Sequence, residues 1–216
     1  MRILIADNHT LFSQGLRSLV ERQADFEVVA EARDGREALE QCRELRPDVV
    51  LMDVVMPGLN GLEATRQIRQ ETPATRILAL SMHIDKRYVL GMLEAGASGY
   101  LAKDAPFDEV ARALRAVAAG HVYLAPAIAG VVVENVARRT SPVVASTAPD
   151  LSQREREVLQ LLAEGCTARQ VARQLHIGIK TVETHRRNML RKLQLDNIAD
   201  LVRYAIREGI TSLDEA

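Results

Sequence analysis

The sequence predicts a doubly wound, five-stranded parallel α/β domain with strand order 2-1-3-4-5, followed by an all-α domain of four helices. Short apolar runs alternate with helical patterns through residues 1–120, which is typical of a parallel sheet covered on both faces. A stretch rich in Pro, Ser, Thr and Ala then precedes residues 151–216, where helix-capping motifs recur. At 216 residues, the chain has the length of two small domains.

The α/β domain is expected to contain five strands, each followed by a helix. Right-handed crossovers leave few topologies, and the order 2-1-3-4-5 is a common one. That order places a ligand crevice at the carboxyl ends of the first and third strands. The strand candidates are 2–6, 27–32, 48–53, 76–81 and 98–102, and the helix candidates are about 9–22, 35–45, 60–70, 85–95 and 106–119.

The composition is that of an ordinary globular protein, with 47% hydrophobic and 26% charged residues and a net charge of −1. The near-neutral total conceals an acidic region 1–120 and a basic region 151–216.

Cys42 and Cys166 lie far apart without metal-ligand spacing, so we expect buried or half-buried thiols. No apolar run reaches the roughly 20 residues of a membrane helix, and the chain opens on a strand pattern, so a cytoplasmic protein is expected.

One carboxylate, Asp53, ends the apolar segment 48–53 and precedes a turn at Pro57-Gly58. A charged group at the end of a buried strand costs desolvation free energy unless partners or a metal meet it. Ligands of open α/β sheets bind at this edge. Four other polar residues should gather there from the first, fourth and fifth strands: Asp7, Asn8, Ser81 and Lys103.

These side chains suit a phosphoryl group on a carboxylate. No Gly-rich phosphate loop follows the first strand, where residues 7–11 read Asp-Asn-His-Thr-Leu, so dinucleotide and P-loop sites are excluded. Clustered carboxylates favour a hard cation such as Mg²⁺. A hydroxyl and an ammonium, Ser81 and Lys103, would hold phosphoryl oxygens and offset their charge. Three histidines show no ligand spacing and are expected to be structural or surface residues: His9, His83 and His121.

The region 1–120 resembles the receiver domain of two-component response regulators. The resemblance is carried by Asp7-Asn8, Asp53 with Met56-Pro57-Gly58 and Gly61, Ser81, Tyr100 and Lys103. It implies that a sensor histidine kinase phosphorylates Asp53, that Ser81 and Lys103 bind the phosphoryl oxygens, and that the rotamer of Tyr100 reports the state. It also implies a Mg²⁺ site formed by Asp7, Asn8, Asp53 and the backbone carbonyl of Val55.

One residue departs from the receiver pattern. The second residue of the acidic pair is usually Asp, and here it is Asn8. An amide oxygen can ligate a metal but carries no charge, so Mg²⁺ should bind more weakly. We expect reduced rather than abolished phosphorylation.

A connector occupies residues 121–150. It begins with a helical pattern after Pro126 that includes Ile128 and Val131, and residues 140–149 read as a linker by composition. The apolar face of this helix could pack on the α/β domain, on the C-terminal domain or on a second protomer.

Four helices are expected in residues 151–216. Capping boxes at Ser152–Glu155 and Thr167–Gln170 begin the first two helices. A turn at 176–178 leads to a third helix over about 179–193, and Asn197 starts a fourth. Two helices joined by a short turn, the second of them basic, are typical of a helix-turn-helix DNA reader.

Residues 151–210 resemble the LuxR-type four-helix DNA-binding domain, which together with a receiver implies the NarL/FixJ class of response regulators. The matching residues are 154–159 (Arg-Glu-Arg-Glu-Val-Leu), Gly165, Ala172, Lys180-Thr181-Val182, His185 and Lys192-Leu193. On the third helix we expect base contacts from Glu183, Thr184 and Arg187. Phosphate contacts or helix positioning are expected from Lys180, Thr181, His185, Arg186 and Arg191. The resemblance implies that the fourth helix dimerises on DNA, here through Leu201, Val202, Ala205 and Ile206.

The sequence thus predicts a transcriptional regulator, not an enzyme, that binds paired half-sites of double-stranded DNA as a homodimer once phosphorylated. An aspartyl-phosphate phosphatase using Asp53 would need an acid/base two residues later, where Val55 stands. A phosphorylation-independent regulator, whose receiver serves for dimerisation, is the main alternative and is favoured by Asn8. An acyl-homoserine-lactone sensor is disfavoured because the N-terminal half resembles a receiver.

Overall fold

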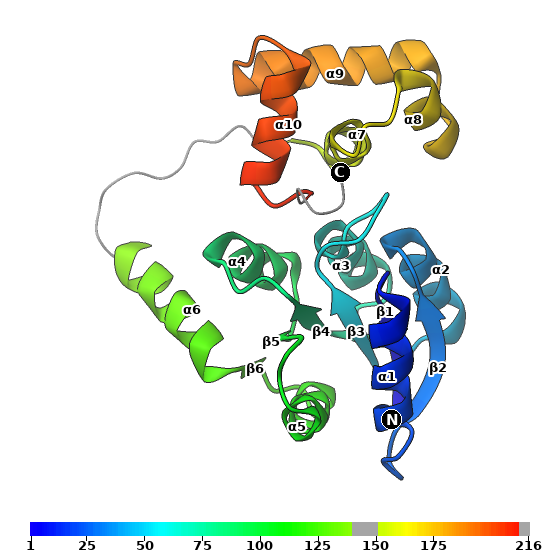
Figure 1. Ribbon diagram of the computed structural model, residues 1–216, viewed down its shortest axis with the longest axis vertical. Helices are drawn as coiled ribbons and strands as arrows, with labels where there is room; N and C mark the ends of the chain where they lie inside the picture. Colours follow the sequence, from blue (N-terminus) through cyan, green and yellow to red (C-terminus); the bar gives the residue numbers. More distant parts are fainter. Residues whose placement is uncertain (140–150, 212–216) are drawn as a thin grey trace. The chain divides into compact units, whose positions relative to one another are not determined.

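The computed structural model describes residues 1–139 and 151–211 (Figure 1). The chain divides into two compact units, Met1–Pro142 and Val143–Ala216. The first unit is an α/β domain and the second is helical. Each unit is considered by itself below.

The first unit contains a parallel sheet with the strand order β2-β1-β3-β4-β5-β6. The predicted order of five strands is confirmed, but the sheet has a sixth strand that the prediction lacks. This strand pairs Tyr123 with Gly99 and Leu124 with Tyr100. Two residues are too few to show an apolar periodicity, so no sequence pattern predicted this strand. The strands are β1 (Arg2–Ala6), β2 (Glu27–Ala32), β3 (Val49–Asp53), β4 (Arg76–Ser81), β5 (Gly99–Ala102) and β6 (Tyr123–Leu124).

Helices cover both faces of the sheet (Figure 1). On one face lie α1 (Thr10–Val20) and α5 (Phe107–Ala118). On the other lie α2 (Gly35–Leu45), α3 (Gly61–Glu71) and α4 (Lys86–Ala95). Each face has its own apolar core, and the five helices predicted for this region are confirmed, with ends that differ from the prediction by at most two residues.

The central strand β3 is buried along its whole length. Val49 and Leu51 enter the core under α1 and α5, while Val50 and Met52 enter the opposite core. Successive side chains of a strand point to opposite faces, so a strand covered on both faces is apolar throughout. The last residue, Asp53, is thereby carried to the carboxyl edge of the sheet, where it is only 4% exposed.

The turn after β3 depends on two glycines. Gly58 has φ +75°, a conformation that costs L-residues free energy. Gly61 begins α3 directly against the end of β3, and its N–H donates to the carbonyl oxygen of Val54 at 3.0 Å. A Cβ atom at Gly61 would lie 1.8 Å from the carbonyl oxygen of Asp53. Only glycine permits this close approach of α3 to the functional edge.

Helix α6 (Pro126–Arg139) packs on the first unit through α4. Ile128 is 1% exposed and belongs to the core beneath α2, α3 and α4, and Val131 and Val132 pack against that core. Of the three surfaces that the sequence left open for this helix, the structure shows contact with the α/β domain.

The second unit contains α7 (Gln153–Ala163), α8 (Ala168–Gln174), α9 (Ile179–Leu193) and α10 (Ile198–Arg207). Both predicted capping boxes are formed, at Ser152–Glu155 and Thr167–Gln170. One carboxylate oxygen of Glu155 accepts from the Ser152 backbone N–H at 2.8 Å and from Lys192 Nζ at 2.6 Å. Glu155 thus ties the start of α7 to the last turn of α9. Across both described parts of the chain, none of the helices is long and apolar enough to cross a membrane.

Candidate functional site

Two carboxylates and an ammonium meet at the carboxyl edge of the sheet. Asp7 follows β1, Asp53 ends β3, and Lys103 follows β5. Lys103 Nζ lies 2.6 Å from Asp53 Oδ2 and 2.7 Å from Asp7 Oδ2. All three side chains are 3–4% exposed, so their charges interact more strongly than they would in water. The structure brings these predicted site residues together.

His9 is a surface residue, as expected, with its side chain 57% exposed, and it also lies against this cluster. Its ring Nδ1 lies 3.1 Å from Asp7 Oδ1 and 3.6 Å from Asp53 Oδ2. Its backbone N–H donates to Asp7 Oδ1 at 2.8 Å, which folds the ring back over the carboxylates. The ligand atoms of Asp7, His9 and Asp53 all lie within 4.8 Å of one another.

Burial raises the pKa of Asp53 from 3.8 to about 6. The Lys103 ammonium opposes this rise, and the neighbouring Asp7 carboxylate adds to it. The Val54 N–H donates to Asp53 Oδ1 at 2.7 Å and also favours the charged form. Above about pH 6 Asp53 is therefore an ionised carboxylate held in a site where its charge is costly.

Ser81 and Tyr100 form the other side of the edge. Ser81 is fully buried at the end of β4, and its carbonyl accepts from the Lys103 backbone N–H at 2.9 Å. Its Oγ accepts from the His83 N–H at 3.0 Å. The Tyr100 hydroxyl donates to the His83 carbonyl at 2.5 Å, so the ring is turned inward and is fully buried. That burial raises the pKa of Tyr100, and a hydrogen bond with Ser81 opposes the rise.

The oxygen donors at this edge suit Mg²⁺. Asp7 and Asp53 supply carboxylates, and Asn8 follows Asp7 as a half-buried amide. Val55 lies two residues beyond Asp53, where its backbone carbonyl would complete the predicted set. Carboxylates, an amide oxygen and a carbonyl oxygen are hard ligands of the kind Mg²⁺ selects. The residues present therefore fit the cation that the sequence predicts.

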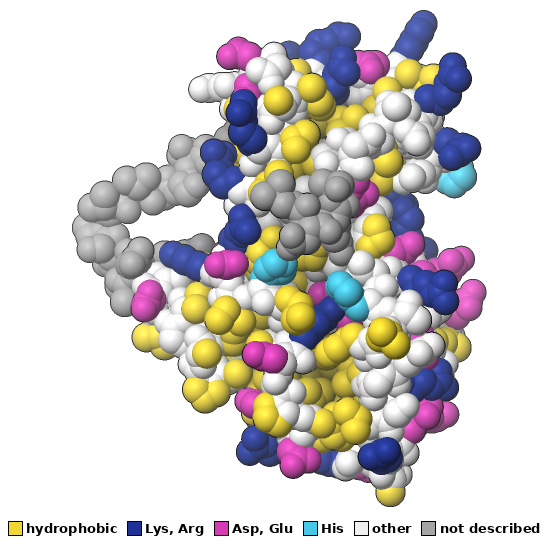
Figure 2. All heavy atoms as spheres, viewed as in Figure 1, with side chains coloured by type: hydrophobic (Ala, Val, Ile, Leu, Met, Phe, Trp, Pro, Cys, Tyr) yellow, Lys and Arg dark blue, Asp and Glu magenta, His cyan; other side chains and the backbone are white. Residues whose placement is uncertain are grey.

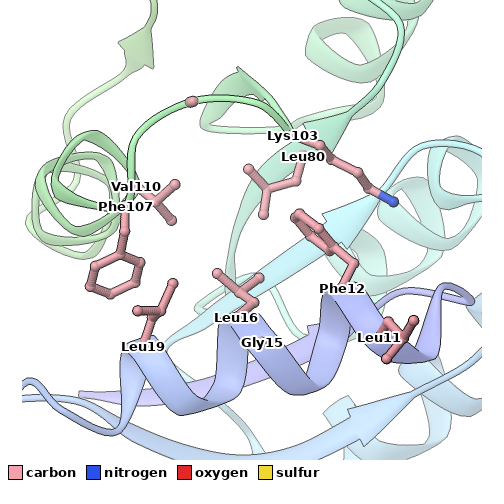
Figure 3. A pocket seen from close by; sticks show the side chains of 10 residues that line it. Leu11, Phe12, Gly15, Leu16, Leu19, Leu80, Lys103, Phe107 and Val110 are labelled. Atoms are coloured by element: carbon pink, nitrogen blue, oxygen red, sulfur yellow. The ribbon is translucent and has the colours of Figure 1, made fainter.

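A groove of about 300 Å³ runs between α1 and α5 beside this edge (Figure 3). Leu11, Gly15 and Leu19 line it from α1, and Phe107 and Val110 line it from α5. Leu11 is 87% exposed, which is unusual for a large apolar side chain. At the end nearest the site, Phe12 projects toward Lys103, whose Nζ lies 4.9 Å from the ring centre (Figure 3).

In the second unit, α9 presents one buried and one exposed face. Val182 and Met189 are buried in the core of this unit. Four polar residues at helical spacing point the other way and are all exposed: Lys180, Thr184, Arg187 and Arg191. Thr181 and Arg186 are also exposed, and Glu183 and His185 are half-buried. In Figure 2, Lys and Arg side chains gather over the part of this unit that α9 occupies in Figure 1.

Two of the residues expected at base edges make contacts within the helix. Glu183 forms an ion pair with Arg186 at 2.6 Å. The Thr184 hydroxyl donates to the Lys180 carbonyl at 2.8 Å. Arg187 is exposed on the same face, so it is the most available of the predicted base-reading side chains.

The predicted dimer contacts on α10 need correction. Leu201 and Ala205 are fully buried in the core of the second unit, where α10 packs on α7. An amphipathic helix of a small domain buries its most apolar positions in the core of that domain. The sequence alone did not distinguish these core positions from a second, less buried row of apolar residues on the same helix. Val202 and Ile206 are half-buried and Ile198 is 43% exposed, so the accessible apolar stripe is Ile198, Val202 and Ile206.

Comparison with known proteins accounts for both units. Residues 3–115 match the response regulator receiver domain family, and residues 149–205 match the family of bacterial regulatory proteins called the luxR family. The chain belongs to the LuxR-type response regulators. It is therefore a two-component transcriptional regulator that carries a receiver domain and a DNA-binding domain.

Relatives match this response regulator over its whole length. The transcriptional regulatory protein LiaR of Bacillus subtilis is 40% identical over 98% of this chain and 100% of its own. The oxygen regulatory protein NreC of Staphylococcus epidermidis is 37% identical over 97% of this chain and 99% of its own.

Solved structures agree with this assignment. A LuxR-family response regulator from Aurantimonas is 43% identical, with a TM-score of 0.60 over 63% of this chain and 97% of that one. RcsB of Salmonella enterica, solved on a promoter with a phosphomimetic, is 25% identical, with a TM-score of 0.61 over 98% of this chain and 99% of that one.

The site residue that sequence reasoning missed in this response regulator is His9. Its place in the chain, and not its spacing from other possible ligands, indicated a role at the site. It stands two residues after Asp7, in the short loop between β1 and α1, and that loop lies at the carboxyl edge of the sheet. Any side chain in such a loop is a candidate for the site.

Proposed function

We propose that Asp53 is the phosphoacceptor through which a sensor histidine kinase controls DNA binding by this response regulator. The observation that carries the proposal is the ion pair of Lys103 with both Asp53 and Asp7, at 2.6 and 2.7 Å. This arrangement supplies a nucleophilic carboxylate beside a fixed positive charge. Both are buried, so the charge interacts strongly with a phosphoryl group on the carboxylate.

Each neighbour has a separate part in the transfer. The Asp53 carboxylate attacks the phosphorus of the kinase phosphohistidine, the bond from phosphorus to the imidazole nitrogen breaks, and the imidazole leaves with a proton. Lys103 offsets the negative charge that the phosphoryl group brings. Ser81 offers its hydroxyl to a phosphoryl oxygen, which withdraws it from Tyr100 and His83 and biases the rotamer of Tyr100. Asp7, Asn8, Asp53 and the Val55 carbonyl would hold Mg²⁺, which supplies positive charge to the incoming phosphoryl oxygens when bound.

The Asp53→Asn variant tests the phosphoacceptor. Acetyl phosphate with Mg²⁺ should raise the mass of the wild type by one phosphoryl group and leave the variant unchanged. The same variant should be more stable than the wild type by on the order of 2 kcal/mol at pH 8 without divalent cations, because it removes a buried charge with a raised pKa. Loss of phosphorylation could not then be attributed to misfolding.

The pH dependence of that difference has a defined sign. A carboxyl whose pKa is raised by folding binds protons more tightly in the folded state, so its ionisation destabilises the fold. The stability gap should therefore open as pH rises from about 4 to about 6 and stay constant above. A gap that closes with rising pH, or phosphorylation that persists in Asp53→Asn, would contradict the assignment.

The DNA-reading surface is proposed to be the exposed face of α9 in the major groove. Replacing Arg187 with alanine should weaken specific binding by about 1–3 kcal/mol and relax base preference at one position. The measurement is a titration of specific and random duplexes at one fixed salt concentration. Arg22→Ala removes an equal charge from an exposed position in the first unit and serves as the control. Equal losses on both duplexes would make Arg187 a phosphate contact instead.

The remaining parts of the proposal concern partners. The kinase should dock over the groove between α1 and α5, because Lys103 lies at its end and exposed Leu11 offers apolar contact beside Asp53. The active form is proposed to be a cytoplasmic homodimer on paired half-sites of double-stranded DNA. The dimer contact would use the accessible stripe Ile198, Val202 and Ile206 of α10.

Asn8 favours a second candidate function, regulation without phosphorylation. An uncharged amide in the metal set weakens the site on which phosphoryl transfer depends. Under this alternative, wild type and Asp53→Asn would bind DNA equally with and without acetyl phosphate. A phosphorylation-dependent gain in DNA binding by the wild type alone would exclude it.

A further inference from the structure

We propose that His9 is a ligand of the divalent cation at this site and directs it toward first-row transition ions in preference to Mg²⁺. This assignment rests on the proposed function, because it concerns the cation beside Asp53.

Three side-chain atoms that could bind a metal ion surround the ammonium nitrogen of Lys103. Lys103 Nζ lies 2.6 Å from Asp53 Oδ2, 2.7 Å from Asp7 Oδ2 and 3.3 Å from His9 Nδ1. The ammonium thus stands where a cation can be shared by two carboxylates and an imidazole. Ligands on opposite sides of a metal ion at about 2.1 Å each are about 4.2 Å apart. His9 Nδ1 lies 3.1 Å from Asp7 Oδ1 and 3.6 Å from Asp53 Oδ2, and both distances are shorter than that separation.

The position of the His9 ring is fixed by the loop. Its backbone N–H and its Nδ1 both lie within 3.1 Å of Asp7 Oδ1, so the ring is folded over the carboxylate pair. His9 is nevertheless 57% exposed, which leaves space for water ligands and for movement of the ring. The Nδ1 lone pair is open to a metal ion only in the tautomer that carries its proton on Nε2.

The chemical types of the ligand atoms decide which metal ions the site binds more tightly. Asn8 is neutral, so Asp7 and Asp53 are the carboxylates next to the cation, and Lys103 opposes them with a positive charge. Mg²⁺ depends on charged oxygen ligands and gains little from an imidazole. First-row transition ions accept imidazole nitrogen as well as carboxylate oxygen. A set of two carboxylates and one imidazole therefore shifts the preference away from Mg²⁺.

The experiment compares Mn²⁺ and Mg²⁺ on the full-length protein. Free Mn²⁺ is followed by electron paramagnetic resonance, and Mg²⁺ affinity is obtained by competition. In His9→Ala, Mn²⁺ affinity should fall on the order of tenfold, because even outer partners of metal ligands contribute that much. Mg²⁺ affinity should change by less than about threefold. His121→Ala removes an exposed histidine of the loop before β6 and should leave both affinities unchanged.

A second measurement detects the ligand atom directly. Electron spin echo spectra of the wild-type protein with Mn²⁺ should contain modulation from an imidazole nitrogen, and His9→Ala should lose it. Wild-type spectra without nitrogen modulation, or equal effects of His9→Ala on both ions, would overturn the assignment.

The outcomes also separate this assignment from the proposed function. If Mg²⁺ binds, acetyl phosphate modifies Asp53 and His9→Ala changes nothing, only the role of His9 fails. If neither ion binds the wild type and its mass stays unchanged with acetyl phosphate, the phosphoacceptor assignment fails with it.

Discussion

Replacing Gly61 with alanine is expected to lower the free energy of unfolding of the first unit by about 3 kcal/mol and to slow phosphorylation of Asp53. The added Cβ would lie 1.8 Å from the Asp53 carbonyl oxygen and 3.1 Å from Met52 Cγ. Both are parts of the buried strand β3, which cannot shift without moving Asp53, the proposed phosphoacceptor. Urea unfolding and the rate of mass gain with acetyl phosphate measure the two effects.

Gly15→Ala is the matched control for that substitution. It makes the same chemical change within α1, where a Cβ would meet no atom within 4 Å. Alanine is the better helix former, so this variant should be stabilised by about 0.5–1 kcal/mol. Similar destabilisation by both variants would show that the close approach at Gly61 is not the cause.

Replacing Leu201 with alanine is expected to destabilise the second unit by about 2–5 kcal/mol. The side chain is fully buried in the core where α10 packs on α7, so its removal leaves a cavity. Native-state hydrogen exchange of α7 and α10 in the full-length protein measures the loss. DNA binding should fall as a consequence, because less of the unit is folded.

Val202→Ala distinguishes core from dimer contact. Val202 is half-buried on the accessible stripe of α10, so its truncation should cost roughly 1 kcal/mol of monomer stability or less. Its main effect should be weaker dimerisation on DNA with two half-sites. If Leu201→Ala left hydrogen exchange unchanged and impaired only dimerisation, the sequence-based assignment of Leu201 to the dimer surface would be restored.

The parts of the fold that followed from sequence are those in which local pattern and global fold agree. The apolar run before Asp53, in the predicted strand 48–53, indicated a central strand buried on both faces, and the capping boxes at Ser152 and Thr167 marked helix starts that the structure confirms. Asp7, Asp53 and Lys103 were predicted to lie together because the strand order places the ends of their strands at one edge of the sheet.

The parts that did not follow depend on tertiary contacts. The strand Tyr123–Leu124 exists because the edge of β5 is open to it, and two residues carry no periodicity. The apolar positions of α10 were recognised, but whether Leu201 faces its own core or a partner depends on how α10 packs against α7. His9 enters the site because a backbone hydrogen bond to Asp7 turns its ring, which spacing rules for metal ligands do not detect.

The carboxylate of Glu155 joins the start of α7 to the end of α9. It accepts from Ser152, one of the first described residues after the connector, and from Lys192 in the last turn of α9. Displacement of the chain at Ser152 would therefore act on the far end of the recognition helix through a single oxygen atom. Glu155→Gln would keep the cap of α7 and weaken the ion pair with Lys192. The variant would therefore change the orientation of α9 while leaving the folding of α7 intact.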